Sequence, residues 1–439
     1  MYQNISKQML LFIEKNKTAF HTVDSVKQIL LQNGFEELAE CNKWNIKQGK
    51  SYFVTRNLSS IIAFKVGEKV SDFNFQIASV HTDSPCFKVK ENAEIHVNDA
   101  YTKLNTEGYG GMIRYSWLDR PLSIAGRVLV KGSDGEICSK LLDIDRDLMM
   151  IPSVAVHMNR DMNKGLELNM QTDMLPLLSE CLDEQLLLQK IAEELSVEKE
   201  QIIGSDLYVY CRDKASVWGL HNEYISSPRL DDQQCVFASL QGLLNGGNEN
   251  TISMLACFDN EEVGSGTKQG AASTFLYDVT KRVSDALGKS EDDYYRAIAS
   301  SFMLSADNAH AVHPNHPELT DANNNVYMNK GVVVKSHAGQ KYTSDGMSIA
   351  VVRELAGKAD VPLQFFSNRS DKAGGSTLGN LAMAQVSMNC VDIGLAQLAM
   401  HSAVETAGMR DTAYMISLME AFYNSQIVQL KDGNVRIAF

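Results

Sequence analysis

Short apolar segments that run directly into acidic or histidine-bearing motifs constrain the fold of this chain most. FNFQIASV (73–80) is followed by HTD, ISMLACF (252–258) by DNEE, and SFMLSAD (301–307) ends in an aspartate. Between and beside them, residues 232–245 and 267–285 have helical spacing. Strands that alternate with helices predict a parallel sheet covered by helices on both faces.

The acidic and histidine-bearing motifs share one place in this predicted pattern, the carboxyl end of a strand. A fourth motif, AMH, follows the last predicted strand of the series, VSMNCVDIG, after a short loop. Ligands of open α/β sheets bind at the carboxyl ends of the strands, so we expect these side chains to meet in one crevice. The candidates are His81, Asp83, Asp231, Asp232, Glu261, Glu262, Asp307, His310 and His401.

The sequence changes character between residues 94 and 218. The alternating segment LSIAGRVLVKG, the hairpin-like GSDG and the strand-like DLYVYC occur here, with one charged helix expected at 179–200. A chain of 439 residues also exceeds the usual size of a single core. We therefore predict one domain in two parts, 1–93 and 219–439, interrupted by a β-rich domain at 94–218.

Composition and charge argue against several classes of partner. The formal net charge is −13 and no dense basic run occurs, so neither nucleic acid nor an anionic membrane is expected as the main partner. No apolar run approaches the ~18–20 residues that cross a bilayer, and the amphipathic N-terminus is not typical of a signal peptide. The eight cysteines form no CxxC pair, so we expect reduced thiols in a cytoplasmic protein.

The candidate residues have the chemistry of a metal site. Imidazole nitrogens and carboxylate oxygens, without cysteine, suit zinc or a similar divalent ion. Two histidines with three or more carboxylates exceed what one tetrahedral ion requires, so they suit two ions that share a bridging carboxylate. In the HTD motif, Asp83 can accept the second imidazole N–H of His81 and fix its tautomer.

Glu261 and Glu262 are adjacent, so their side chains leave the backbone in different directions. This suits a division of roles, in which one glutamate binds a metal ion and the other takes a proton from the attacking water. Taken singly, each motif has a simpler interpretation, because a strand-end aspartate is usually a turn or helix cap and a glutamate pair is usually solvated surface. The joint placement of four motifs at strand ends favours the metal site.

Five motifs, in this order and spacing, closely resemble those of the aspartyl aminopeptidase family of metallopeptidases: SVHTDSP, SSPRLDD, DNEEVGS, SADNAHAVHPN and QLAMHS. Similarity in AFHTV, YFVTRNLSSIIAFKVG, IPSVAVHMNRDMN and GGSTLGN extends the resemblance over essentially the whole chain. The resemblance implies an α/β zinc-peptidase fold of the phosphorylase/hydrolase-like kind, in which helices sandwich a mixed sheet and a β-rich dimerisation domain is inserted. It also implies a homo-oligomer, in which dimers assemble into a tetrahedral dodecamer.

The resemblance implies metal-binding roles at five positions. His81, Asp231 and Asp307 are similar to the ligands of one ion. Asp231, Glu262 and His401 are similar to the ligands of the other ion, with Asp231 as the bridge. Two zinc ions per subunit are therefore expected, although cobalt and manganese accept similar ligands.

Further roles follow from the same resemblance. Glu261 matches the general base of the family, and Asp83 matches the residue that orients the first histidine. The substrate-binding positions of the family match His157, His310, Lys335 and Tyr342. His157 lies in the inserted block, and in the family that residue serves the active site of a neighbouring subunit. Asp232 stands where asparagine is frequent, but the PRLD context favours Asp231 as the bridge.

The implied activity is hydrolysis of the N-terminal peptide bond of peptides, with a preference for an N-terminal Asp or Glu. Lys335, which ends the β-branched run GVVVK, is expected to meet that acidic side chain. Two alternatives stay open: another hydrolase on the same scaffold, such as a deacylase or a carboxypeptidase, and a non-catalytic assembly protein that keeps the fold. The intact ligand set together with Glu261 favours the enzyme.

Overall fold

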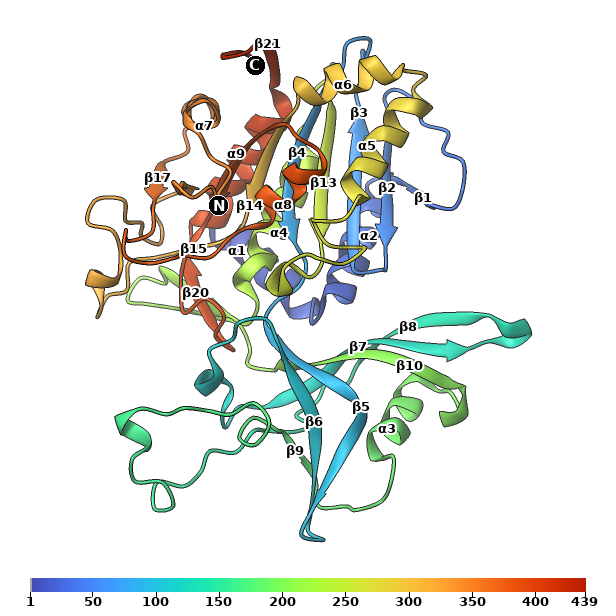
Figure 1. The fold of residues 1–439 in the computed structure, drawn as a ribbon, viewed down its shortest axis with the longest axis vertical. Helices are drawn as coiled ribbons and strands as arrows, with labels where there is room; N and C mark the ends of the chain where they lie inside the picture. Colours follow the sequence, from blue (N-terminus) through green and yellow to red (C-terminus); the bar gives the residue numbers. More distant parts are fainter. Residues whose placement is uncertain (1) are drawn as a thin grey trace.

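A nine-stranded mixed sheet lies at the centre of the computed structural model, which describes residues 2–439 (Figure 1). Its strands lie in the order β1 (Glu36–Leu38), β2 (Ser51–Arg56), β3 (Ser60–Val66), β13 (Ile252–Phe258), β4 (Phe75–His81), β14 (Phe302–Ala306), β18 (Asn389–Gly394), β16 (Val332–Lys335) and β17 (Leu363–Phe366). The four middle strands β13, β4, β14 and β18 are parallel, and β3 and β16 run antiparallel beside them. The mixed sheet implied by the resemblance is confirmed, and the parallel pairing predicted from the strand–helix alternation holds at its centre.

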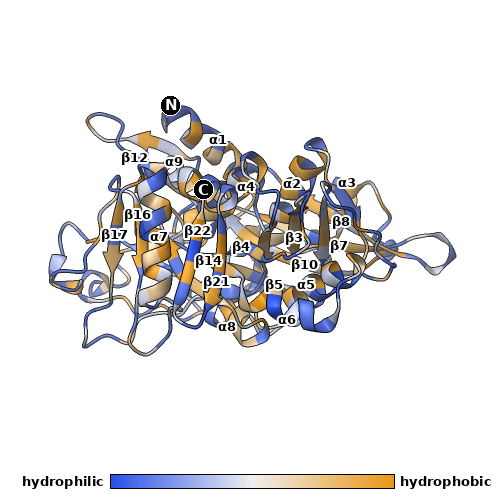
Figure 2. Cartoon of the chain, turned by 90° about the horizontal axis from the view of Figure 1, so that it is seen from above, coloured by the Kyte–Doolittle hydropathy of each residue, from blue (hydrophilic) through white to orange (hydrophobic). Residues whose placement is uncertain are grey.

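Helices cover both faces of this sheet because its strands are apolar on both sides. In β3, Ile61 and Ala63 pack into one core while Ile62 and Phe64 pack into the other, as the period of two of an extended strand requires. One face is covered by α1 (Tyr2–Lys15), α2 (Ala19–Gln32), α4 (Leu230–Asn245), α7 (Gly346–Ala359) and α9 (Asp411–Asn424). The other face is covered by α5 (Phe275–Ala286), α6 (Glu291–Ala299) and α8 (Leu378–Gln385). Figure 2 shows hydrophobic residues on the central strands and hydrophilic residues on the outer loops.

A second, six-stranded antiparallel sheet lies below the central sheet in Figure 1 and has its own core. Its strands lie in the order β8 (Ile137–Asp143), β7 (Leu122–Lys131), β10 (Ile202–Cys211), β5 (Cys86–Val97), β6 (Tyr101–Tyr109) and β9 (Leu177–Ser179). The helix α3 (Leu186–Leu195) packs against it and is shorter than the helix expected at 179–200. The bounds 94–218 of an inserted domain stay a prediction. The strand β5 of this sheet already begins at Cys86, before residue 94.

A five-stranded sheet carries segments that reach the crevice at the strand ends. Its strands lie in the order β11 (Ser216–Trp218), β12 (Tyr224–Ser227), β20 (Glu405–Gly408), β19 (Ala396–Leu398) and β15 (Ala309–His310). The strand β12 leads directly into α4, and the loop between β19 and β20 holds His401. A hairpin of β21 (Gln426–Lys431) and β22 (Asn434–Ala438) follows α9. Among residues 2–439, no helix is long and apolar enough to cross a membrane.

Candidate metal centre

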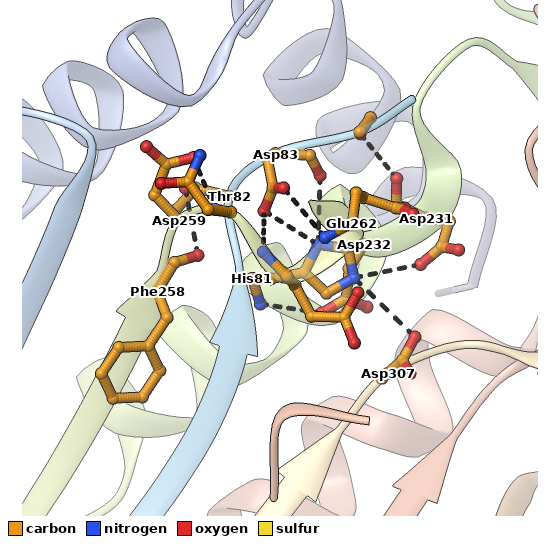
Figure 3. Close-up of polar contacts among 12 residues, drawn as sticks. His81, Thr82, Asp83, Asp231, Asp232, Phe258, Asp259, Glu262 and Asp307 are labelled. Carbon is orange, nitrogen blue, oxygen red and sulfur yellow. Dashed lines mark hydrogen bonds and ion pairs between the residues drawn. The ribbon is translucent and has the colours of Figure 1, made fainter. Parts of the chain in front are cut away.

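The predicted metal-binding side chains meet at the carboxyl ends of the central strands. Figure 3 shows four of them, His81, Asp231, Glu262 and Asp307. His81 is the last residue of β4, Asp307 follows β14, and Glu262 lies just after β13. Asp231 stands at the start of α4, where its φ of −82° and ψ of 111° are not helical. His401 comes from the loop between β19 and β20. The convergence expected from the strand ends is therefore confirmed.

Asp231 lies between the two histidines. Its Oδ1 is 3.4 Å from Nε2 of His81, and its Oδ2 is 3.5 Å from Nε2 of His401. On the first side, Oδ1 of Asp307 is 3.8 Å from the same nitrogen of His81. On the second side, Oε2 of Glu262 is 3.4 Å from Nε2 of His401. The carboxylate of Asp231 thus belongs to two groups of donor atoms, each with one histidine and one further carboxylate.

Backbone carbonyls orient both imidazole rings. Nδ1 of His81 lies 3.1 Å from the carbonyl oxygen of Asp83, and Nδ1 of His401 lies 2.9 Å from that of Gly111. A carbonyl oxygen only accepts, so each Nδ1 carries a proton, and each Nε2, which faces Asp231, is the nitrogen that would bind a metal ion. The sequence predicted that Asp83 orients His81 through its carboxylate, which lies slightly farther away, at 3.5 Å. Gly111 lies between β6 and β7, so the segment that joins these strands also positions His401.

Asp83 joins the glutamate pair to the rest of the site. Its Oδ1 accepts the backbone N–H of Glu261 and its Oδ2 that of Glu262, both at 3.2 Å. The hydroxyl of Tyr109 donates to the same carboxylate at 2.7 Å. The two glutamates form the short helix η5 (Glu261–Val263) directly after the loop that follows β13. One carboxylate therefore fixes the backbone of both glutamates, while Glu262 reaches towards His401.

Glu405, the first residue of β20, is a buried carboxylate that the sequence did not single out. Its Oε2 accepts the backbone N–H of Asp231 at 2.9 Å, and its Oε1 accepts that of His401 at 2.7 Å. It therefore ties together the segments that carry the central aspartate and the second histidine. In the sequence, only its position four residues after His401 connects Glu405 with the site. A single glutamate at such a position cannot be distinguished from a surface residue.

Asp232 is fully buried beside the same group of residues. Its Oδ2 accepts the backbone N–H of His81 at 3.3 Å. Burial raises the pKa of its carboxyl well above the usual range, which favours the neutral acid. The carboxylate of Asp232 thus contacts the backbone of β4. The carboxylate that lies between the two histidines belongs to Asp231.

Lys335 ends β16 and is buried, with 2% of its surface exposed. Its Nζ donates to Oδ2 of Asp307 at 3.2 Å and to the carbonyl oxygen of Asn308 at 3.0 Å. The same nitrogen lies 5.4 Å from the ring centroid of Tyr342. The lysine expected to bind substrate is therefore already paired with a carboxylate of the metal centre.

The other predicted substrate residues occupy two separate regions. His310 and Tyr342 both lie against Phe366, with ring centroids 6.3 Å from it in each case, so they gather beside Lys335. His157 lies in an exposed turn between β8 and β9, and its ring makes no hydrogen bond within residues 2–439. The structure thus brings three of the four residues together at one site and leaves His157 outside it.

The centre concentrates negative charge in a buried space. Burial raises the pKa of Glu261 to about 8, and burial followed by the charge of Asp231 raises that of Glu262. Burial also opposes ionisation of Asp231, but the imidazoles of His401 and His81 that face its two oxygens hold its pKa well below the usual range. Few positive charges lie near these carboxyl groups, so a bound cation would stabilise their ionised forms.

Unpaired oxygens show that the residues present fit a metal. Oδ1 of Asp231, Oδ1 of Asp232 and Oε1 of Glu262 are buried and have no hydrogen-bond donor within residues 2–439. A buried carboxylate oxygen without a partner is costly unless a cation compensates it. Imidazole nitrogens and carboxylate oxygens at these spacings suit a divalent ion such as zinc.

Comparisons with known proteins agree with this chemistry. The family model described as aminopeptidase I zinc metalloprotease (M18) matches residues 12–423. The chain is 47% identical over 425 residues to the probable M18 family aminopeptidase 2 of Clostridium novyi, covering 95% of this chain and 98% of that protein. It is 36% identical over 443 residues to aspartyl aminopeptidase 1 of Schizosaccharomyces pombe, covering 94% of this chain and 93% of that protein.

Solved structures share the fold. A chain in the cryo-EM structure of the Ape4 and Nbr1 complex gives a TM-score of 0.92 at 34% identity, covering 97% of this chain and 86% of that chain. The S. cerevisiae mApe1 dodecamer gives a TM-score of 0.83 at 26% identity, covering 96% of this chain and 97% of that chain. The fold and the site define a metal-dependent peptide hydrolase. The chain belongs to the peptidase M18 family and is a metalloaminopeptidase.

Proposed function

We propose that this aminopeptidase uses two metal ions and releases N-terminal acidic residues from peptides. One observation carries the dinuclear part: the two oxygens of Asp231 face two different histidines, His81 and His401. Asp307 would complete the first ligand set and Glu262 the second. When bound, two divalent ions lower the pKa of the attacking water and stabilise negative charge on the scissile carbonyl. Zinc is the metal named for the family, and cobalt or manganese would accept the same donors.

Glu261 is the proposed general base. Its carboxyl belongs to the same donor group as His81 and Glu262, so it lies within reach of a water held between the histidines. It accepts the proton of the attacking water and delivers it to the leaving amine, which contributes ~10²–10⁴-fold to the rate. Burial raises the pKa of this carboxyl to about 8 without a metal ion, and bound cations would lower it again, which favours the ionised form that accepts a proton. Asp83 supports this role by holding the backbone of Glu261.

The proposed preference for N-terminal Asp or Glu rests on Lys335. An ammonium has three N–H donors, and two of them are directed at Asp307 and Asn308. The third can donate to the side-chain carboxylate of the substrate, next to His310 and Tyr342. The 36% identity with aspartyl aminopeptidase 1 supports the same preference.

We also propose that the chain acts as a homo-oligomer, with dimers assembled into a dodecamer. The turn around His157 exposes apolar residues, and Met158 is 82% exposed, as expected for a segment that packs against another subunit. The likeness to the mApe1 dodecamer supports this arrangement. His157 would then complete the active site of a neighbouring subunit.

The cellular location and the remaining partners stay predictions from the sequence. All eight cysteines are free thiols, which is compatible with the predicted cytoplasmic location. Peptides are the expected substrates, and the acidic net charge of −13 gives no reason to expect nucleic acid.

The proposal is tested by metal analysis together with a peptide panel. We expect two ions per chain by mass spectrometry, loss of activity on chelation, and recovery with zinc. Peptides with N-terminal Asp or Glu should be cleaved faster than those with Leu. Acetylating the N-terminus should abolish cleavage while amidating the C-terminus should not, which separates an aminopeptidase from a carboxypeptidase or deacylase. One ion per chain would overturn the dinuclear centre, and faster cleavage of Leu peptides would overturn the acidic preference.

A further inference from the structure

Asp392 is a fully buried aspartate of the central sheet and does not belong to the metal centre described above. It lies in β18, between two strands that carry functional residues. On one side it pairs with Ser305 of β14, two residues before Asp307, and on the other side it pairs with Lys335 of β16. Within residues 2–439, no cationic nitrogen lies within 4.0 Å of its carboxylate. The hydrogen bonds that this carboxylate accepts therefore decide its role.

The carboxylate of Asp392 accepts hydrogen bonds from two separate loops. Its Oδ2 accepts the backbone N–H of Thr343 at 2.5 Å and the hydroxyl of the same residue at 2.7 Å. Its Oδ1 accepts the hydroxyl of Thr377 at 2.6 Å. The backbone N–H of Asp392 also donates to Oγ of Ser344 at 3.0 Å. One buried residue thus holds both loops against the central sheet.

The first loop joins β16 to α7 and carries Tyr342. It begins directly after Lys335, the last residue of β16, and Tyr342 directly precedes Thr343. Nζ of Lys335 is 5.4 Å from the ring centroid of Tyr342. The position of this ring relative to the ammonium therefore depends on how the loop is held, and Thr343 is the residue that Asp392 holds.

The second loop joins β17 to α8 and contains the segment GGST at 374–377. Its last residue, Thr377, is the N-cap residue of α8. A side chain at Gly379 would come within 2.8 Å of Cβ of Ser305, so only glycine lets α8 begin this close to β14. The close approach places the hydroxyl of Thr377 within reach of Asp392.

Further hydrogen bonds join the two loops to each other, nearer the surface. Nζ of Lys341 donates to the carbonyl oxygens of Ala373 and Gly374, at 3.0 and 2.9 Å. Nδ2 of Asn368 lies 3.5 Å from the hydroxyl of Tyr342. The two loops therefore form one layer beside Lys335, and Asp392 connects this layer to the sheet.

We propose that Asp392 is a positioning residue for substrate specificity: it holds both loops so that Tyr342 stays beside Lys335, and it thereby supports the preference for an N-terminal Asp or Glu. The inference rests on the proposed function, which assigns the acidic side chain of the substrate to Lys335. A carboxylate accepts hydrogen bonds at both of its oxygens, whereas an amide accepts at only one. Asparagine at this position would therefore lose the acceptor for one of the two loops.

The experiment compares Asp392→Asn with the wild type as metal-loaded full chains. Asp345→Asn is the matched control, because it makes the same chemical change two residues after Thr343, at an exposed helix N-cap where asparagine serves as well as aspartate. Hydrogen exchange is followed by mass spectrometry for peptides that cover residues 336–345 and 367–378. We expect exchange in at least one of these segments to become faster by about tenfold in Asp392→Asn. The control should exchange like the wild type.

Peptide hydrolysis measures the effect on specificity. In Asp392→Asn, kcat/KM for N-terminal Asp and Glu should fall by about tenfold and that for N-terminal Leu by less than about threefold. A general loss of stability would reduce all three values alike. Zinc content should stay unchanged, because the hydrogen bonds of the Asp392 side chain reach only Thr343 and Thr377.

Thr343→Val and Thr377→Val provide a second test, because each removes one hydroxyl donor and leaves the carboxylate in place. If Asp392→Asn does not fold, these two variants decide the proposal. In each of them the ratio of kcat/KM for Asp to that for Leu should fall by about threefold or more. An unchanged ratio in both would overturn the proposal.

For Asp392→Asn, wild-type exchange in both segments would overturn the positioning role. An equal loss of kcat/KM on all three substrates, or a gain for Asp and Glu, would overturn the role in specificity. A wild type that cleaves Leu peptides faster than Asp peptides would overturn the proposed acidic preference, and with it the specificity that is assigned to Asp392. Faster exchange in Asp392→Asn would still support the part of the proposal that concerns the two loops.

Discussion

Nζ of Lys335 lies 3.2 Å from Oδ2 of Asp307, while Oδ1 of the same aspartate faces His81. Burial lowers the pKa of Lys335, but the charge of Asp307 outweighs this effect and raises it above its usual value. The lysine therefore stays charged at neutral pH, and one carboxylate connects it to the metal centre. Asp307 is thus expected to contribute to metal binding directly and to substrate specificity through Lys335.

Lys335→Ala tests this connection. Leaving one partner of a buried charge pair alone costs ~2–5 kcal/mol, so we expect kcat/KM for N-terminal Asp or Glu to fall by ~30-fold or more. Peptides with N-terminal Leu or Ala should change much less. The measurement compares kcat/KM for the four substrates, and zinc content, in both proteins. An equal loss on all four substrates, together with lost zinc, would show that Lys335 serves the metal ligand and not the substrate.

Glu261→Gln is expected to keep both metal ions and to lose ~10²–10⁴-fold in kcat, because the amide preserves the shape but cannot accept a proton. Metal content and kcat are measured on the same preparation. Glu262→Gln is the matched comparison, since it removes a proposed ligand and should release metal. Near-wild-type turnover in Glu261→Gln would remove it as the base, and metal loss there would indicate that the two glutamates have exchanged roles.

Glu405→Ala is expected to destabilise the metal-free protein by about 2–4 kcal/mol, because the backbone N–H groups of Asp231 and His401 lose their acceptor. Zinc affinity should fall as well, since both ligands become less well held. Urea unfolding of metal-stripped protein and zinc titration measure the two effects. Glu36→Ala, at an exposed position, is the control and should change stability by less than about 0.5 kcal/mol. Unchanged zinc affinity in Glu405→Ala would contradict the positioning role.

His157→Ala is expected to reduce peptide hydrolysis although His157 makes no hydrogen bond to residues 2–439 of its own chain. If it completes a neighbouring site, then refolding His157→Ala together with Glu261→Gln should recover part of the activity. Each mixed pair would contain one site with an intact base and an intact partner histidine. Light scattering at the assay concentration checks assembly. A fully active monomer, or mixed oligomers as inactive as their parents, would contradict the shared site.

His21 should make the protein less stable in acid. Burial lowers its pKa to about 4, and its Nδ1 lies 2.9 Å from the hydroxyl of Thr18. The unfolded chain takes up a proton near the ordinary pKa of ~6.5 while the folded chain does not, so stability falls as the pH drops from ~6.5 to ~4. In His21→Gln, the loss of unfolding free energy between pH 7.5 and 4.5 should be smaller by about 2–3 kcal/mol. Urea unfolding at both pH values measures this, with exposed His96→Gln as the control; the same loss in all three proteins would contradict the prediction.

The sequence by itself determined the centre of the molecule. Buried parallel strands read as apolar runs, and their carboxyl ends meet at one edge of a sheet, so polar motifs at these ends must lie together. His81, Asp307 and the glutamate pair could be placed this way because each directly follows its strand. The antiparallel pairing of the outer strands could not be predicted, because an antiparallel strand beside a parallel sheet has no distinct pattern in its own sequence.

Only the tertiary structure decided how these side chains are supported. Glu405 contacts the backbone of Asp231 across 174 positions of sequence, and Lys335 reaches Asp307 from a different strand. A carboxylate or an ammonium has the same local sequence signal whether it is solvated or paired, because its partner comes from a segment that packing brings near.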